Sequence, residues 1–406
     1  MNLPFFLARR ITVKSNRTFS KLIVRVAIAG ILLGLAIMIL SVAILRGFKQ
    51  EVIAKQRGFA GDVTVFKFDL NSSYENTPFV LSDSSRHLIE GIDGIRSLQA
   101  FATKPGIINA NDEVEGVVLK GIDETYDQAF LSNILIDGHT IDFTDTLAAK
   151  QQILISDYTA ARMNLSVGDD FLMYFVQEPL RKRKFEIVGI YRLGVEEIDK
   201  TYAIGDLSII QRLNNWERGT VGGYEIKIDD YRRLAEKTEE VFNSLPIDLR
   251  ALSVVEQYPQ VFQWLELLDI NTQIILVLML LVAIINMISA LLIMILERTT
   301  MIGILKALGL SNGGIRKIFL YNAAYLIGIG LLLGNLVGLG FCIFQSETHF
   351  FSLDEASYYV SYVPVAVNVL DVVLLNIGVL LICVLALLVP SGLASRISPV
   401  KAISFK

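Results

Sequence analysis

Four long apolar runs constrain this chain more than any other feature of its sequence. They cover residues 26–45, 274–296, 319–344 and 365–389. A helix needs about 20 residues to cross the hydrocarbon core of a bilayer, and each run reaches that length. Asn368, Asp371 and Asn376 interrupt the fourth run, so a shorter span that begins near Val372 is the alternative there.

The charges around these runs predict how the chain is oriented. Hydrophobic residues make up 53% of the chain and charged residues 19%, which is typical of a membrane protein. Only basic charges precede the first run and follow the fourth, and basic charges outnumber acids between the second and third. Only the acids Glu347, Asp354 and Glu355 lie between the third and fourth. The positive-inside rule therefore predicts that both termini and the loop at 297–317 face the cytoplasm.

The N-terminal residues 1–21 are basic and amphipathic. The apolar run that follows is too long for the core of a signal peptide, and no small-residue cleavage site comes after it. We therefore expect an interfacial helix followed by a retained membrane anchor.

Residues 46–270 carry the alternating patterns of a soluble α+β domain. Strands are predicted at 63–68, 116–122, 152–155, 171–176, 184–191 and 224–228, and helices at 83–89, from the Ser156 cap past Ala161, from the Asp206 cap to Trp216, and at 231–245. This segment is expected to form two subdomains. Its two ends, 46–105 and 220–270, would form one, and the residues between them would form a second, inserted subdomain. The acidic excess of this segment favours neither a nucleic acid nor an anionic lipid as its partner. Both cysteines, Cys342 and Cys383, fall in predicted spans, so the segment has no disulfide.

The sequence thus predicts an α-helical membrane protein with four transmembrane helices plus a large α+β periplasmic domain between helices 1 and 2. The transmembrane helices are expected at 22–45, 271–296, 318–344 and 365–389. The other segments are a cytoplasmic amphipathic segment at 1–21, a periplasmic domain with a stalk at 46–270, a cytoplasmic loop with a short helix at 297–317, a periplasmic loop at 345–364 and a cytoplasmic tail at 390–406.

The stalk is the segment that leads into the second span. Ser253 and Glu256 have the spacing of a capping box, and Pro259 is expected to kink the helix that follows. The alternative is a flexible linker, but the apolar and aromatic content through Phe262 and Trp264 favours a helix that transmits force.

The loop at 297–317 contains a short amphipathic helix. Thr299 or Thr300 is expected to cap it and Gly309 to end it. Its apolar stripe consists of Met301, Ile304, Leu305 and Leu308. Such a stripe either lies on the bilayer surface or docks into a groove on another protein.

Glycines at four-residue spacing mark two of the spans. Gly30 and Gly34 form a pair in the first span, and Gly330, Gly334 and Gly338 form a triplet in the third. Glycines on one face allow a second helix to approach closely, within one subunit or between two. Asn335, Asp371 and Asn376 are costly in lipid, so we expect them at helix interfaces or near the membrane boundary.

Motifs for binding ATP or a metal do not occur in this sequence. It has no GxxxxGK[ST] loop for ATP, no HExxH and no CxxC. The histidines His87, His139 and His349 are scattered, so no metal site is predicted. A hairpin around Glu178, Pro179, Leu180 and Arg181 ends in a basic run that is either a solvated turn or a contact for an acidic partner.

Two stretches resemble a known family. The sequence ERTTMIGILKALGLSNGGIRKIFLYNAAYLIGIG from Glu297 is similar to the hallmark of FtsX/MacB-type ABC transporter permeases, and PSGLASRISPVKAISF at 390–405 is similar to their closing motif. The layout of one span, a large outer domain and three further spans also matches. Within this family, VGD at 167–169 and FEIVGIYR at 185–192 most resemble the lipoprotein-releasing LolC/LolE permeases.

The resemblance implies a complex in which this chain is a non-catalytic membrane subunit. It pairs with a second permease, identical or related, and with ABC ATPase subunits that bind ATP and Mg²⁺, so the chain itself holds no cofactor. The ATPase would dock on a coupling helix formed by Thr299, Thr300, Met301, Ile304, Leu305, Lys306, Leu308 and Gly309. In lipoprotein-releasing members, a lipoprotein enters sideways from membrane lipids in the outer leaflet of the bacterial inner membrane and passes to a periplasmic carrier.

Two features depart from the family pattern. Family members commonly carry an acid where Met301 stands. In one type of subunit a long hairpin captures the carrier, but the corresponding hairpin at 177–183 is short here, with Glu178, Pro179, Leu180 and Arg181 as the candidate contacts.

Other functions compete with lipoprotein release. A MacB-like or FtsX-like permease would serve peptide export or envelope signalling by mechanotransmission. MacB-like chains carry a fused N-terminal ATPase and FtsX-like chains a smaller outer domain, whereas this chain has only residues 1–25 before its first span. A signalling or scaffolding protein would have no ATPase partner, and a membrane enzyme is the weakest option because no acid–base or nucleophile constellation is found.

Overall fold

The computed structural model describes residues 18–69 and 74–395. The predicted amphipathic segment up to residue 17 and the tail from residue 396 lie outside these residues. The chain divides into two compact units. The helical unit comprises Met1–Lys49, Trp264–Ser352 and Tyr362–Lys406, and the core-domain unit comprises Gln50–Gln263 and Leu353–Ser361.

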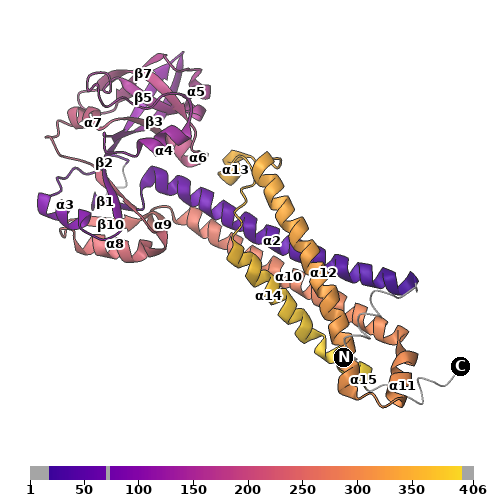
Figure 1. Ribbon diagram of the computed structural model, residues 1–406. Helices are drawn as coiled ribbons and strands as arrows, with labels where there is room; N and C mark the ends of the chain where they lie inside the picture. Colours follow the sequence, from indigo (N-terminus) through magenta and orange to yellow (C-terminus); the bar gives the residue numbers. More distant parts are fainter. Residues whose placement is uncertain (1–17, 70–73, 396–406) are drawn as a thin grey trace. The chain divides into compact units, whose positions relative to one another are not determined.

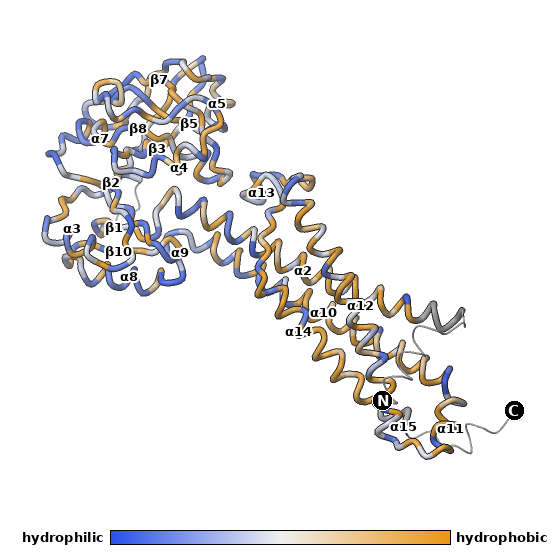
Figure 2. The backbone as a smooth tube through the Cα atoms, in the orientation of Figure 1, coloured by the Kyte–Doolittle hydropathy of each residue, from blue (hydrophilic) through white to orange (hydrophobic). Residues whose placement is uncertain are grey.

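The helical unit confirms the four predicted transmembrane helices. Within the described residues, four helical stretches are long and apolar enough to cross a membrane. They belong to α2 (Thr18–Ala60), α10 (Pro259–Glu297), α12 (Asn312–Thr348) and the stretch Val369–Gly392. Figure 2 shows apolar residues concentrated along these helices. One buried apolar cluster joins them, with Ile31 of α2, Met287 of α10, Leu326 of α12 and Val379 of the fourth stretch among its members.

Two helix boundaries differ from the sequence prediction. The helix that Ser253 caps ends at Gln257, just before Pro259, as expected of a helix interrupted by proline. The second membrane helix begins at Pro259 itself, so stalk and span form one continuous helix instead of meeting at 271. Proline is tolerated in the first turn of a helix, where its missing N–H is not needed. The fourth span consists of α14 (Val369–Ala386), capped by Asn368, and α15 (Leu388–Ser395).

The core-domain unit is built on one mixed sheet (Figure 1). Among the described residues, ten strands pair in the order β10-β1-β9-β2-β3-β8-β5-β7-β4, and β6 pairs with β2 and β7. The strands are β1 (Val63–Lys67), β2 (Ile95–Ala110), β3 (Glu113–Ile122), β4 (Leu135–Gly138), β5 (Gln152–Ser156), β6 (Asp170–Phe175), β7 (Arg181–Tyr191), β8 (Tyr202–Asp206), β9 (Gly223–Ile228) and β10 (Leu249–Ser253). Burial alternates along β6, where Phe171, Met173 and Phe175 are buried, whereas the central strands β5 and β8 are buried almost throughout.

The sheet does not separate into the two predicted subdomains. The first half of β2 pairs with β9 and its second half with β6, while β3 pairs with β2 along most of its length. In Figure 1, β2 runs from the end of the domain that holds β1 and β10 into the end that holds β5 and β7. Both predicted subdomains therefore share one strand and one sheet.

Short helices cover the sheet and connect its strands. They are α3 (Asp83–Glu90), α4 (Gln128–Ile134), α5 (Asp157–Met163), α6 (Glu196–Thr201), α7 (Leu207–Leu213), the 3₁₀ helix η1 (Tyr231–Arg233), α8 (Leu234–Asn243), α9 (Val254–Gln257) and α13 (Glu355–Tyr358). Ser156 and Asp206 cap α5 and α7 as predicted, because each side chain accepts a bond from an early N–H of its helix. The helix after Asp206 ends at Leu213 instead of Trp216.

Candidate functional site

The short helix of the 297–317 loop is α11 (Thr299–Ala307). Its N-cap residue is Arg298, so the prediction that Thr299 or Thr300 caps the helix is wrong. The Thr299 hydroxyl lies 3.2 Å from the carbonyl of Ile295 and 2.7 Å from that of Leu296. Because only Arg298 separates α11 from α10, this hydroxyl bonds back to the last turn of α10 instead of to an N–H of α11.

The end of α11 is formed by Gly309, whose φ is +90°. The N–H of Gly309 donates to the carbonyl of Lys306, and the N–H of Leu310 donates to that of Leu305, both at 3.0 Å. A left-handed residue at this point satisfies the last carbonyls of the helix, and glycine adopts that conformation without strain.

Apolar side chains lie on two sides of α11. Ile302 is fully buried and belongs to the apolar cluster of the helical unit. On the predicted stripe, Ile304 is 48% exposed and Leu308 79% exposed, while Met301 and Leu305 are half-buried. No buried role for Ile302 was predicted from the sequence. The available signal was its spacing of seven residues from Ile295, which lies in the same buried cluster. One side of α11 is therefore fixed to the bundle and the other is uncovered.

The glycine triplet of α12 faces α2. A Cβ added to Gly330 would lie 2.7 Å from Cβ of Ile31, one added to Gly334 would lie 3.0 Å from the carbonyl oxygen of Leu32, and one added to Gly338 would lie 3.2 Å from Cα of Ala36. Contacts shorter than about 3 Å are too close for a real Cβ. In this structure the triplet serves contact between two helices of one chain.

The glycine pair of α2 faces α10. A Cβ on Gly30 would lie 1.6 Å from Nδ2 of Asn286, and one on Gly34 would lie 3.7 Å from the carbonyl oxygen of Met279. Nδ2 of Asn286 donates to the carbonyl of Val26 at 3.3 Å. Gly30 therefore leaves room for a polar contact between the first two membrane helices.

Polar groups in the helices pair with one another. Nδ2 of Asn335 donates to Oδ1 of Asn376 at 2.7 Å, and Nδ2 of Asn376 donates to Oδ1 of Asn335 at 2.9 Å. Arg46 and Asp371 form an ion pair at 2.6 Å. As predicted, these polar side chains lie between helices, where their partners offset the cost of removing them from water.

A buried ion pair lies where α2 enters the core domain. Nζ of Lys120 is 2.7 Å from Oε1 of Glu225, and the two side chains are 3% and 5% exposed. The ammonium also donates to the carbonyl of Phe59 and to the hydroxyl of Tyr126. Burial lowers the pKa of Lys120 and raises the pKa of Glu225, while their mutual attraction opposes both shifts. No sequence motif pointed to this pair.

The predicted hairpin is formed by β6 and β7. Nη1 of Arg181 donates to the carbonyl of Arg212 at 2.9 Å, and Nε2 of Gln177 donates to the carbonyl of Leu213 at 3.1 Å. The hairpin is thus fixed to the last turn of α7, and Arg181 is engaged in internal contacts. Val176 and Leu180 are 75% and 63% exposed at its tip, beside Glu178 and Pro179.

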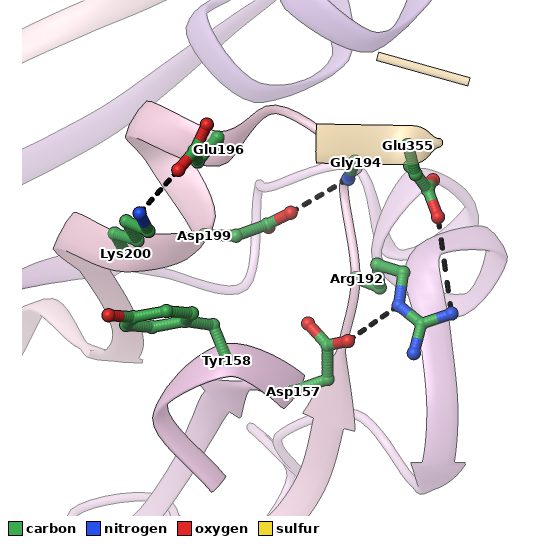
Figure 3. A pocket seen from close by; sticks show the side chains of 8 residues that line it. All are labelled: Asp157, Tyr158, Arg192, Gly194, Glu196, Asp199, Lys200 and Glu355. Atoms are coloured by element: carbon green, nitrogen blue, oxygen red, sulfur yellow. Dashed lines mark hydrogen bonds and ion pairs between the residues drawn. The ribbon is translucent and has the colours of Figure 1, made fainter. Parts of the chain in front are cut away.

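A pocket of about 290 Å³, lined mainly by charged residues, lies in the core-domain unit (Figure 3). It is lined by Asp157, Tyr158, Arg192, Gly194, Glu196, Asp199, Lys200 and Glu355. Nε of Arg192 is 2.6 Å from Oδ2 of Asp157, and Lys200 pairs with Glu196. The carboxylate of Asp199 accepts bonds from the N–H groups of Leu193 and Gly194, and burial raises its pKa to about 6.

The pocket offers little chemistry of its own, because its basic groups already have acidic partners. Among the described residues, no group of three or more His, Cys, Asp or Glu side chains is arranged to hold a metal ion. The most specific contacts of the described residues are those of α11, of the glycines in the membrane helices and of the end of α2 in the core-domain unit.

Known protein families match both parts of the chain. The MacB-like periplasmic core domain matches residues 26–241, and the FtsX-like permease C-terminal region matches residues 273–399. The lipoprotein-releasing system transmembrane protein LolC of Neisseria meningitidis serogroup B is 25% identical and covers 98% of each chain. The corresponding LolE of Haemophilus influenzae is 22% identical over 100% of each chain. The periplasmic region of MacB from Actinobacillus actinomycetemcomitans is 17% identical, covering 52% of this chain and 95% of that chain with a TM-score of 0.36.

These matches define a multi-pass membrane protein with a MacB-like core domain between its first two membrane helices. The chain belongs to the FtsX/MacB-type permease family, as expected from the motif that begins at Glu297.

Proposed function

We propose that this chain is the permease subunit of an ABC transporter complex that extracts lipoproteins from the outer leaflet of the inner membrane and passes them to a periplasmic carrier. The observation that carries the proposal is its similarity to LolC and LolE, proteins named for lipoprotein release, over at least 98% of its length. The similarity includes the core domain and all four membrane helices, so it reflects a shared architecture.

A separate ATPase that binds ATP and Mg²⁺ supplies the energy by docking on α11. Support comes from Ile304 and Leu308, which are exposed on a helix whose other side is fixed by the buried Ile302. An uncovered apolar stripe on a short helix fits a groove on a partner protein. The positive-inside rule places α11 and both termini in the cytoplasm, where ATP is available.

Force passes from α11 to the core domain along α10. This helix runs without interruption from Pro259 to Glu297, and Arg298 alone separates it from α11. In the core-domain unit, Oγ1 of Thr64 lies 3.0 Å from Oε1 of Gln257 and 3.1 Å from the carbonyl of Ala60. The segment before α10 and the end of α2 therefore meet at one buried hydroxyl, where movement of one helix affects the other.

Substrate and carrier complete the proposed cycle. The lipoprotein enters laterally from the outer leaflet between the outer ends of α2 and α10, and a second permease, identical or related, provides the opposite wall. The carrier contacts the β6–β7 hairpin through the exposed Leu180, since Arg181 is already bound to α7.

The test uses the variant Ile304→Asp in the tagged full-length chain. A charge on the stripe has to be desolvated when the partner docks, so we expect co-purification of the ATPase to fall at least tenfold. Ile247→Asp is the matched control, because Ile247 is 93% exposed in the core domain and lies outside the stripe. Mass spectrometry of the wild-type complex identifies the ATPase and any acylated protein, and ATP is then added to measure release.

Each outcome decides part of the proposal. An ATPase and acylated proteins that leave on addition of ATP support lipoprotein release. An ATPase without acylated proteins refutes this substrate and favours a MacB-like or FtsX-like role in peptide export or signalling. Equal recovery of the ATPase with Ile304→Asp and Ile247→Asp refutes α11 as the docking helix.

A further inference from the structure

The connection between α12 and α14 enters the core-domain unit. Its residues Leu353–Ser361, which include α13, belong to that unit, whereas the chain on either side belongs to the helical unit. A connection between membrane helices is ordinarily a solvated loop with few contacts. Here the segment makes specific contacts with the last turns of α2 and with the loop between β7 and α6.

Lys55 of α2 holds the segment through two groups. Its Nζ donates to Oε1 of Glu355 at 3.3 Å and to the carbonyl of Tyr359 at 2.9 Å. Oε2 of Glu355 also lies 4.0 Å from Nη1 of Arg192. Figure 3 draws this ion pair. The Lys55 and Glu355 side chains are only 18% and 22% exposed, so salt and water screen them less than a surface pair.

Apolar contacts reinforce these bonds. The ring of Tyr359 packs against a buried cluster of the core domain that includes Leu193 and Val195, and Val360 is 2% exposed. The N–H of Leu353 donates to the carbonyl of Ser361 at 2.9 Å, which closes the segment into a compact loop.

Gly194 provides the space for this attachment. Its φ is +75°, and an added Cβ would lie 2.2 Å from Oε1 of Glu355 and 2.6 Å from Nζ of Lys55. Any larger residue would both strain the backbone and displace the ion pair. The ion pair between Lys55 and Glu355 therefore depends on a glycine at position 194.

We infer that Lys55, Glu355 and Tyr359 are positioning residues that keep the α12–α14 connection bound to the core domain throughout the transport cycle. The core domain is then attached to the membrane helices at three places: the end of α2, the start of α10 and this segment. Movement of α12 and α14 reaches the core domain through the segment as well as through α10. This inference rests on the proposed function, because it assigns the segment a part in transmission.

The test replaces the ion pair by a covalent link that can be made and broken. Lys55→Cys and Glu355→Cys are combined in a chain in which Cys342 and Cys383 are alanine, and the complex is assayed with its ATPase. Without the link, lipoprotein released per ATP hydrolysed should fall by about fivefold, the factor expected when one partly buried ion pair is lost. A short bis-methanethiosulfonate bridge should restore the ratio to that of the cysteine-free complex, and reduction should abolish it again.

The matched control applies the same treatment to Arg162→Cys and Glu115→Cys, an ion pair at 2.5 Å on the core domain away from this segment. Its released lipoprotein per ATP should not change with or without the bridge. If the bridge at 55 and 355 blocks release, the segment must detach during the cycle and the inference is wrong. Unchanged coupling in the unbridged cysteine pair also overturns it.

A second readout separates this inference from the proposed function. The yield of the bridge between positions 55 and 355 is measured in membranes with and without ATP and vanadate, and needs no transport substrate. Equal, high yields support a permanent attachment even if the complex releases no lipoprotein, which would refute the proposed function alone. A yield that falls by several-fold on adding nucleotide shows detachment and overturns the inference.

Discussion

Nζ of Lys120 lies 2.7 Å from Oε1 of Glu225 in the interior of the core domain. The same ammonium binds the carbonyl of Phe59 in the last turn of α2, a position where a cation also offsets the negative end of the helix dipole. The hydroxyl of Tyr126 donates to that carbonyl at 3.0 Å. This group connects the end of the first membrane helix to β3 and β9, so we expect its loss to lower stability.

The first prediction concerns removal of one member of this pair. Lys120→Met leaves the Glu225 carboxylate buried without its partner, which should cost about 3–5 kcal/mol of unfolding free energy. Combining Lys120→Met with Glu225→Leu removes both charges and should recover most of that loss. Urea unfolding of the full-length chain in detergent, followed by the fluorescence of Trp216 and Trp264, measures both values.

The control for this prediction is the exposed pair of Lys184 and Asp170, whose side chains are 66% and 47% exposed. Lys184→Met should cost no more than about 1 kcal/mol. If the single variant at Lys120 is as stable as the control, the buried pair does not hold the end of α2.

The second prediction concerns the pH dependence that Asp199 confers. Burial raises the pKa of this carboxyl to about 6, above its ordinary value of 3.8. The folded state therefore binds the proton more tightly than the unfolded state, and the stabilisation is full below pH 4 and is lost as the pH rises through 6. A shift of this size corresponds to about 3 kcal/mol.

The comparison of wild type with Asp199→Asn isolates this group, because asparagine does not titrate. The wild-type chain should lose stability relative to the variant between about pH 4 and pH 6, and the difference should be constant above pH 7. Thermal unfolding of both chains is measured across this range. A difference that does not change with pH would mean that Asp199 titrates near its ordinary value.

Local patterns in the sequence predicted the elements that depend on neighbouring residues. Ser253 and Glu256 form the expected capping box, and Gly309 has the left-handed conformation that ends α11. The length and apolarity of the four runs were sufficient to predict the membrane helices, because a bilayer imposes the same requirement on every span.

Long-range pairing could not be predicted in the same way. No strand was predicted at 95–110, yet β2 covers these residues and includes Pro105. On the side of β2 away from β3, the described strand β9 pairs up to Phe101 and β6 pairs from Ile107. Pro105 lies in the gap between these two partners, where no neighbouring strand would accept a hydrogen bond from its missing N–H. Lys120 and Glu225 are likewise brought together only by the order of strands, which no local pattern encodes.

The third prediction concerns the paired amides of α12 and α14. Asn376→Leu removes the donor to Oδ1 of Asn335 and should destabilise the helical unit by about 0.5–2 kcal/mol. The double variant Asn335→Leu with Asn376→Leu should be less destabilised than the sum of the two single variants, because neither amide is then left without its partner. Unfolding in a mixed-detergent titration measures this coupling, and additive losses would show that the two amides do not interact.

The fourth prediction uses the glycines of α12 as a matched set. A Cβ added to Gly334 would lie 3.0 Å from the carbonyl oxygen of Leu32 in α2, whereas a Cβ added to Gly340 would have no neighbour within 4 Å. Gly334→Leu should therefore separate α12 from α2 and lower the unfolding free energy by about 1–3 kcal/mol, the cost of overfilling a close contact. Gly340→Leu adds the same volume to the same helix and should be neutral or slightly stabilising, since leucine favours a helix more than glycine does. Thermal unfolding in detergent compares the two variants, and equal stability would mean that Gly334 does not face a close helix contact in the membrane.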